Sequence, residues 1–193
     1  MQNLLPEEKL VFSSIKINPS DDELAGLNSL LAQVSDWQQA EKLLIDNSAA
    51  QFLYRKLPFL SNKTLIPDSV FVNLKQAYLH TFRFNFALYD AFSEAMKKFD
   101  ENGVKIIPLK GVYLAEKLYS DIGLRQMSDI DLLVQAKDAE KAMKILGEMG
   151  YVSDNYYCDT PEERMIHFPA MRRGEISFEI KRMLDENEGT TIT

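Results

Sequence analysis

The sequence predicts an α+β protein, in which a helical N-terminal region is followed by a short segment of strands and helices. Up to about residue 100, apolar residues recur at three- and four-residue steps, as they do on one face of a helix. After Gly103, the order changes to strand, helix, strand, helix and hairpin. We therefore expect a helical region over residues 1–103, a core over 104–184 and a disordered tail over 185–193.

The composition is typical of a globular protein with one domain or two small ones. The chain has 193 residues, of which 46% are hydrophobic and 26% charged. No apolar run approaches the roughly 18 residues of a membrane span, and the N-terminus lacks the pattern of a signal peptide. The lone Cys158 rules out an internal disulfide, so we expect a cytoplasmic protein that is not bound to a membrane. The net charge of −7 disfavours polymeric nucleic acid as the substrate.

Four short helices are predicted before residue 58. The first begins at Pro6, because proline suits the first helical turn and Glu7-Glu8 complement its positive end. Ser20 caps the second helix, and Ser35-Asp36-Trp37 opens the third. Asn47-Ser48 breaks or kinks the third helix before a fourth.

The longest helical pattern runs from Pro67 to about Asp100, after a loop over 58–67. Its apolar residues are Val70, Leu74, Tyr78, Phe82, Phe86, Tyr89, Phe92 and Met96, with Phe71, Phe84 and Leu88 beside them. This wide stripe predicts a helix that is covered on more than one side and joins the two halves of the chain. Asn102-Gly103 ends the helix, because glycine tolerates the left-handed conformation.

The second half contains short elements in close succession. We expect strands at Val104–Leu109 and Asp129–Val134, helices at Val112–Tyr119 and Ala136–Met149, and a loop at Tyr151–Glu163. Two further strands, Met165–Met171 and Ile176–Arg182, form a hairpin around Arg172-Arg173-Gly174-Glu175.

Two carboxylates two residues apart are the first candidate functional feature. Asp129 and Asp131 share one face of the predicted strand, while Ile130 and Leu132 face the core. Acidic side chains at this spacing repel each other, and a site that holds them usually also holds a hard divalent cation. Taken alone, such a pair is more often a helix cap or a solvated strand end.

Lys110-Gly111 lies where the first strand leads into a helix. A glycine there allows close backbone approach, and the free N–H groups of a helix start attract phosphate. Lys110 is either a phosphate ligand or an ordinary surface lysine. Phosphate binding beside a pair of metal-binding carboxylates is what phosphoryl or nucleotidyl transfer requires.

At these residues the sequence resembles the nucleotidyltransferases of the DNA polymerase β-like superfamily. It is more closely similar to the bacterial branch termed uncharacterised nucleotidyltransferase. The residues that carry the resemblance are Leu109-Lys110-Gly111, Tyr119, Arg125 and Asp129-Ile130-Asp131. The strict superfamily pattern has Gly-Ser or Gly-Gly at the turn where this chain has Lys110-Gly111. The resemblance is most specific over 104–134 and extends more weakly to about residue 182.

The resemblance implies a minimal nucleotidyltransferase core with a small mixed β-sheet. It also implies transfer of a nucleoside monophosphate from a nucleoside triphosphate to a hydroxyl of a small molecule or a protein. Asp129 and Asp131 would bind Mg²⁺ or Mn²⁺. Glu179 would be the third carboxylate, with Glu175 in the turn as the alternative. The branch commonly has histidine two residues after this acid, whereas this chain has Lys181.

Lys110, Gly111, Arg125 and Ser128 are the candidate substrate-binding residues. The planar guanidinium of Arg125 suits a phosphate, but it suits equally a structural pairing with Asp121 or Asp129. Ser128 has a simpler role in shaping the start of the strand.

A non-catalytic module with a binding or regulatory role is the rival hypothesis. Superfamily enzymes usually carry a further helical segment, so we expect a partner chain or a further C-terminal segment to complete the pocket, unless catalysis is lost. His80, His167 and Cys158 do not form a zinc pattern, and we interpret both histidines as structural.

Overall fold

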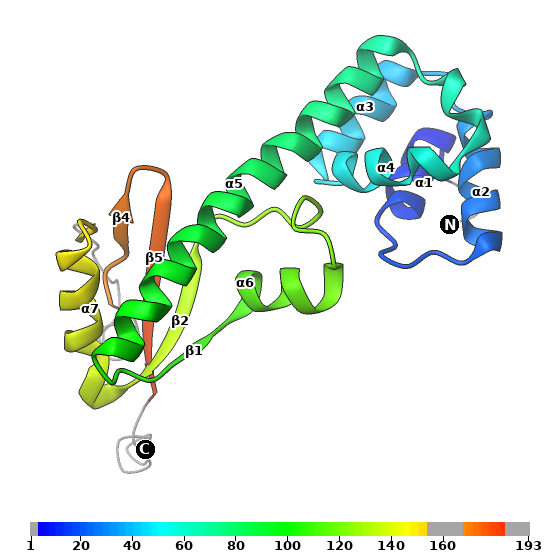
Figure 1. The fold of residues 1–193 in the computed structure, drawn as a ribbon. Coiled ribbons are helices and arrows are strands. Elements are labelled where there is room, and N and C mark those ends of the chain that lie inside the picture. The colour runs from blue at the N-terminus through cyan, green and yellow to red at the C-terminus, as the bar shows by residue number, and fades with distance from the viewer. Residues whose placement is uncertain (1–3, 154–167, 184–193) are drawn as a thin grey trace, which may run out of the picture. The chain divides into compact units, whose positions relative to one another are not determined.

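The computed structural model describes residues 4–153 and 168–183, and it shows an α+β protein (Figure 1). Two compact units are present: Met1–Phe84 with Leu118–Gln126, and Asn85–Lys117 with Met127–Thr193. The division of the chain near residue 103 into a helical region and a core stays a prediction. Within the described residues, no helix is both long enough and apolar enough to cross a membrane.

The first unit is helical. It contains α1 (Pro6–Ser14), α2 (Asp21–Leu31), α3 (Trp37–Asp46), α4 (Ala50–Lys56) and the first part of α5 (Asp68–Glu101). The segment predicted as a loop over 58–67 contains 3₁₀ turns at Leu57–Phe59 and Ser61–Leu65. Leucines dominate the core of this unit, and they include Leu10, Leu27, Leu31, Leu44, Leu53 and Leu74.

A buried carboxylate links two helices of the first unit. Glu7 was expected to complement the positive end of its own helix, α1. Its side chain is 2% exposed, and Oε1 accepts hydrogen bonds from the N–H groups of Ser35 (2.9 Å) and Asp36 (3.0 Å). The Ser35 hydroxyl donates a third bond at 3.3 Å. These bonds hold the pKa of Glu7 below its ordinary value, so the buried carboxylate stabilises the start of α3 in its ionised form.

A loop of the first unit is fixed by Asp121. Its carboxylate accepts hydrogen bonds from Arg55 (2.7 Å), from the Tyr78 hydroxyl (3.2 Å) and from the Gly123 N–H (2.9 Å). The Tyr78 ring lies so close to Gly123 that a Cβ atom there would be 2.5 Å from the ring. The loop therefore depends on the absence of a side chain at Gly123.

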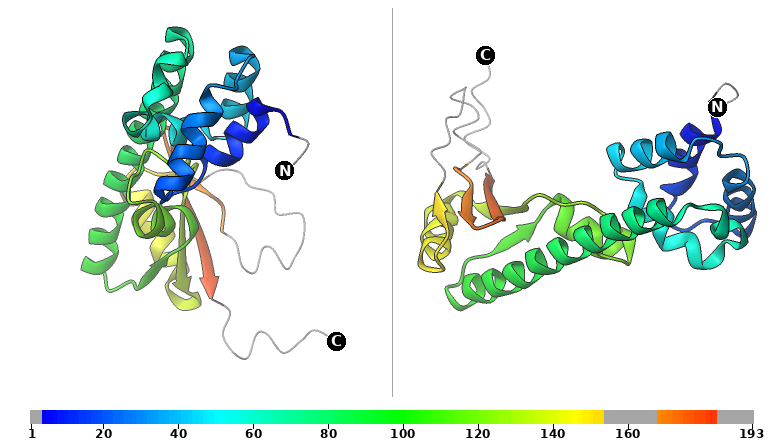
Figure 2. Two further views of the ribbon diagram at one scale, coloured as in Figure 1. Left: turned by 90° about the vertical axis from the view of Figure 1, so that its right-hand side faces the viewer. Right: turned by 90° about the horizontal axis from the view of Figure 1, so that it is seen from above.

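The second unit contains a mixed five-stranded sheet, as the resemblance implied. The strands are β1 (Ile106–Pro108), β2 (Ile130–Gln135), β3 (Val152–Ser153), β4 (Met171–Arg173) and β5 (Ile176–Met183). Their order is β1-β2-β5-β4-β3, and β2 and β5 are parallel while the other neighbours are antiparallel. Helix α7 (Ala139–Glu148) and the second part of α5 lie on one side of the sheet (Figure 2).

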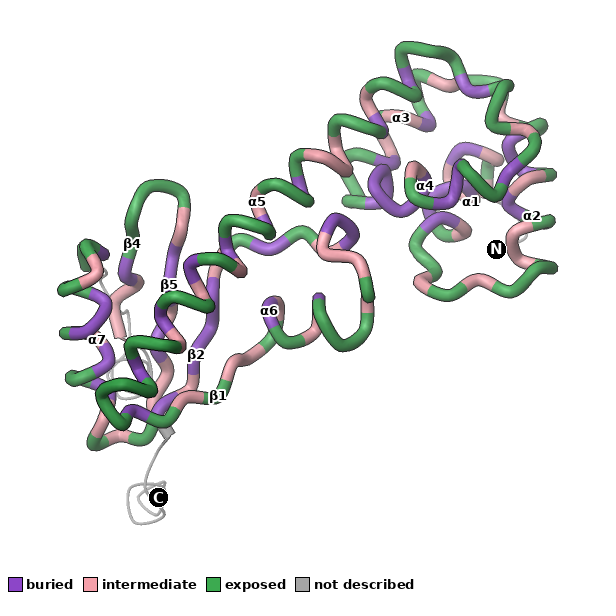
Figure 3. Tube along the Cα trace, viewed as in Figure 1, coloured by how far each residue is buried: buried purple, intermediate pink, exposed green. Residues whose placement is uncertain are grey.

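Buried side chains mark the core of this second unit. Figure 3 shows burial concentrated along β2, β5 and the facing sides of the helices. The fully buried residues of the two central strands are Ile130, Leu132, Phe178 and Ile180. Apolar residues of the two helices, including Leu88, Phe99, Ala142 and Leu146, are buried as well. The apolar side chains of these strands are thus buried on one face of the sheet, and Asp131, Glu179 and Lys181 lie on the other.

Several predicted boundaries were wrong in detail. The first strand is shorter than Val104–Leu109, and the helix expected from Val112 begins at Lys110 as α6 (Lys110–Leu114) and continues as a π-helical turn to Tyr119. Residues 136–138 form a 3₁₀ turn before α7, and β3 lies at the start of the predicted loop Tyr151–Glu163.

The hairpin turn is shorter than predicted, since β4 extends to Arg173. Gly174 accommodates the turn with a φ of 61°. The strand predicted from Met165 was wrong at residues 168–170, which precede β4 and are not in a strand, and its part before residue 168 lies outside the described residues, as do Cys158, His167 and the tail 185–193.

Candidate active site

The parallel pairing of β2 and β5 sets the geometry of the site. Asp131 is the register partner of Glu179, and the flanking pairs are Ile130 with Phe178 and Leu132 with Ile180. Because side chains alternate along a strand, burial of the apolar pairs on one face directs the two acids to the other. The predicted facing of Asp131 is thus explained by the packing of its neighbours.

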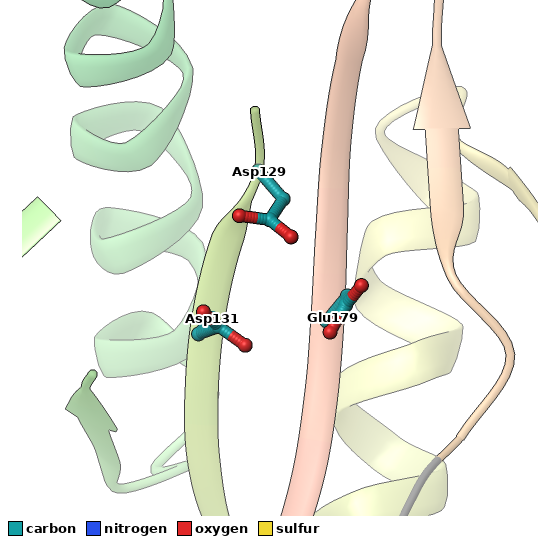
Figure 4. A group of neighbouring side chains, drawn as sticks. All are labelled: Asp129, Asp131 and Glu179. Carbon is teal, nitrogen blue, oxygen red and sulfur yellow. The ribbon is translucent and has the colours of Figure 1, made fainter. Parts of the chain in front are cut away.

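Asp129 completes a cluster of three carboxylates. It immediately precedes β2, and Asp129, Asp131 and Glu179 each have a carboxylate oxygen within 4.8 Å of the others. Figure 4 shows the three side chains projecting from neighbouring strands towards a shared space. Oxygen ligands at this spacing fit a hard divalent cation such as Mg²⁺ or Mn²⁺. Glu175, the alternative third acid, lies in the turn between β4 and β5.

Two lysines contact the most buried of these acids. Asp131 is 2% exposed; Lys110 Nζ lies 3.1 Å from its carboxylate, and Lys181 Nζ donates a hydrogen bond to Oδ1. Burial raises the pKa of Asp131, but the hydrogen bonds and charges of Lys181 and Lys110 outweigh burial, so that the pKa is lowered overall. Burial lowers the pKa of Lys181. Its hydrogen bond to Asp131 has the opposite effect, and the pKa is raised overall. Asp131 and Lys181 are therefore both ionised.

Lys110 has an uncommon backbone conformation. Its φ is 45°, in the left-handed region that favours glycine. The preceding residue is fixed to the site, because the N–H of Leu109 donates to the carbonyl of Asp131 at 2.9 Å. Strain of this kind clusters at functional sites and costs roughly 1–3 kcal/mol. Here it accompanies a side chain that extends from the first residue of α6 to Asp131.

Gly111 is in close contact with another part of the second unit. A Cβ atom at this position would lie 3.2 Å from both Cγ and Sδ of Met127. The glycine thus allows the turn to approach Met127, whereas its approach to a phosphate stays a prediction. Ser128 is exposed and directly precedes Asp129, and its role in binding substrate or in shaping the start of the strand stays a prediction.

Arg125 belongs to the first compact unit, whereas the carboxylates belong to the second. Its guanidinium carbon lies 5.9 Å from the centre of the Tyr119 ring, a distance typical of a cation–π contact. Its pairing with a phosphate or with Asp129 stays a prediction.

Comparison with known proteins identifies the family. A sequence model of the family described as uncharacterised nucleotidyltransferase matches residues 33–192, which is most of the chain. The chain belongs to this family. The resemblance found at residues 104–134 is thereby confirmed for a much longer segment of the chain. Neither the curated proteins nor the solved structures include a significant match to the chain.

Lys181 is the residue of this carboxylate cluster that the sequence analysis did not predict. It was noted only as a departure from the histidine common in the branch, and no role was assigned to it. The signal was nevertheless present, because Lys181 follows Glu179 by two residues and must share its face of β5. Its bond to Asp131 depends on the pairing of β5 with β2, which the sequence did not define.

Proposed function

We propose that this nucleotidyltransferase transfers a nucleoside monophosphate from a nucleoside triphosphate to a hydroxyl group, with Mg²⁺ or Mn²⁺ as the cofactor. The observation that carries the proposal is the convergence of Asp129, Asp131 and Glu179, whose carboxylate oxygens lie within 4.8 Å of one another. In a member of a nucleotidyltransferase family, such a cluster matches the ligand set that a hard cation requires.

The three carboxylates would hold the metal, and the metal would offset the charge of the triphosphate and lower the pKa of the attacking hydroxyl. Lys110 would bind a phosphate group. Its side chain is 61% exposed, so the ammonium is not buried at Asp131. It can therefore move from Asp131 to an incoming phosphate. Gly111 is assigned to the substrate because a glycine at a helix start allows close approach of a phosphate, and Ser128 and Arg125 are assigned to it from the sequence alone.

The transfer step forms one bond and breaks one. The hydroxyl oxygen of the acceptor attacks the α-phosphorus, and the bond from that phosphorus to the oxygen bridging to the β-phosphate breaks. Pyrophosphate leaves with the electron pair of the broken bond, and the hydroxyl proton passes to a carboxylate of the cluster and then to water. The acceptor is a small molecule or a protein side chain, because the net charge of −7 disfavours a nucleic-acid polymer. A single cysteine favours a cytoplasmic setting.

The test uses the full chain with each of the four nucleoside triphosphates labelled at the α-phosphate. Small-molecule and protein fractions of a cell extract supply acceptors, and Mg²⁺ or Mn²⁺ is present. We expect a labelled acceptor together with pyrophosphate release, and a loss of at least about 100-fold in Asp131→Asn, which removes a metal ligand. Glu175→Gln, a matched change in the hairpin turn, should retain activity. Undiminished transfer by Asp131→Asn would disprove the assignment.

One observation favours the rival, non-catalytic module. Asp131 already has two lysine partners, so the charge of the site is partly neutralised without a cation. A module of this kind would bind the triphosphate but would release no pyrophosphate with any acceptor fraction. Binding and turnover measured on the same preparation separate the two functions.

A further inference from the structure

The ammonium of Lys181 lies between two of the three carboxylates. Its Nζ donates to Oδ1 of Asp131 and is 3.6 Å from Oε2 of Glu179. The side chain is only 12% exposed, in contrast to that of Lys110, which reaches the same aspartate from solvent. Lys181 therefore lies where a cation shared by Asp131 and Glu179 would be bound.

Two lysines offset part of the negative charge of the cluster. Three carboxylates within 4.8 Å repel one another, and that repulsion is strong where one of them is almost fully buried. Lys181 neutralises part of this charge from inside the cluster, and Lys110 does so from its edge. A divalent cation that binds Asp131 and Glu179 must displace the Lys181 ammonium or share both carboxylates with it.

We propose that Lys181 is an internal counter-cation, which holds the carboxylate cluster together and competes with the divalent cation for Asp131 and Glu179. The proposal rests on the metal site of the proposed function and adds a residue that sets its affinity. A consequence is weak binding of the free metal ion, because each binding event must overcome an existing ion pair.

Four variants separate this role from a general effect of charge. Lys181→Met removes the ammonium and keeps an unbranched chain, whereas Lys181→Arg keeps the charge. Lys144→Met is the matched control, because Lys144 is 78% exposed on α7 and its partner is Glu148 at 3.8 Å. Lys181→Gln, which retains a hydrogen-bond donor for Asp131, replaces the methionine variant if that variant does not fold.

The measurements are thermal melting with and without Mn²⁺, and calorimetric titration with Mn²⁺ alone. We expect Lys181→Met to melt at a lower temperature than the parent without metal, yet to bind Mn²⁺ at least tenfold more tightly, which corresponds to about 1.4 kcal/mol. The melting temperature and the Mn²⁺ affinity of Lys181→Arg should both be closer to those of the parent than to those of Lys181→Met. Lys144→Met should match the parent in both.

Two results would overturn the proposal in different ways. An unchanged dissociation constant for Mn²⁺ in Lys181→Met, combined with a lower melting temperature, would make Lys181 a purely structural residue and leave the metal site intact. Absence of Mn²⁺ binding in both the parent and Lys181→Met would overturn the proposal together with the metal site itself.

Discussion

Glu179 lies directly opposite Asp131 across the parallel strands β2 and β5, although the two residues are far apart in the sequence. A cation bound to both would link the two central strands of the sheet. Metal binding should therefore stabilise the fold of the second unit as well as provide chemistry.

We expect Mn²⁺ to raise the melting temperature of the parent protein. A ligand that binds only the native state adds about 2.7 kcal/mol to the free energy of unfolding at 100 times its dissociation constant. Joint replacement of Asp129→Asn and Asp131→Asn should abolish this effect, and Glu179→Gln should reduce it. Melting curves of each variant with and without Mn²⁺ provide the measurement, and Glu175→Gln is the control. A full Mn²⁺ effect in the double variant would place the metal elsewhere.

The same double variant should be less stable than the parent when no metal is present. Repulsion between the acids alone predicts the opposite, because asparagine keeps the shape and removes the charge. The structure reverses this expectation, since Lys181 is almost buried and would lose the nearer of its two ionised partners, with only Glu179 left at 3.6 Å. We expect a loss of about 1–3 kcal/mol, measured by denaturant unfolding without metal. Equal or greater stability of the variant would show that repulsion dominates.

Replacement of Lys110 should weaken triphosphate binding. Lys110→Ala and Lys110→Gly both remove the ammonium, and only glycine relieves the backbone strain at φ 45°. We expect both variants to bind a non-hydrolysable triphosphate with Mg²⁺ about tenfold less tightly, with Lys110→Gly about 1 kcal/mol more stable than Lys110→Ala. Calorimetric titration and denaturant unfolding measure the two effects. Parental affinity in both variants would remove Lys110 from the site.

Gly123→Ala should destabilise the first unit. The added methyl group would meet the Tyr78 ring at 2.5 Å, and the hydrogen bond of that ring to Asp121 resists displacement. We expect a loss of about 1–3 kcal/mol in the free energy of unfolding, as for other overpacked sites. Gly26→Ala is a matched control, because the new methyl group would have no described atom within 4 Å apart from its chain neighbours and the nearby backbone of its own helix, α2. It should be neutral or stabilising by up to about 1 kcal/mol.

Glu7 should make the first unit sensitive to acid. Its pKa in the folded protein lies below the ordinary value of 4.5, because Asp36 and Ser35 donate hydrogen bonds to the ionised form. The stabilisation is therefore complete above the unfolded pKa and is lost as pH falls through the folded pKa. Glu7→Gln should lower stability by about 2 kcal/mol at pH 7, and the difference from the parent should shrink below about pH 4. A difference independent of pH would refute this role of Glu7.

Local patterns predicted the strands and helices of the second half of the chain and the shared facing of Asp129 and Asp131, whereas Glu179 was named from the family resemblance. The spacing of Asp129 and Asp131 placed both on one face of a strand, and apolar residues on either side of Glu179 indicated its facing. The structure brings these three residues together, and packing of Ile130 and Phe178 on the opposite face explains why. Alternation along a strand is a local property, so the sequence alone reveals it.

The unpredicted features depend on contacts between distant residues. The bond between Lys181 and Asp131 requires the register of β5 against β2, which is decided by packing across the sheet. The conformation of Lys110 could not be read from its identity, because lysine rarely adopts a positive φ. Strand β3 has only two residues and pairs with β4, so it leaves no periodic signal before the tertiary fold forms.

The pairing of β2 with β5 also orders events during folding. Strands β1 and β2 lie closer in the sequence than β2 and β5, and closing the longer loop costs more entropy. We therefore expect the central parallel pair to form late in refolding. Until β5 joins the sheet, Glu179 and Lys181 are both absent from the vicinity of Asp131. A partly folded chain would consequently have neither the proposed cation-binding centre nor its proposed competitor, and both would arise only when the last strand is in place.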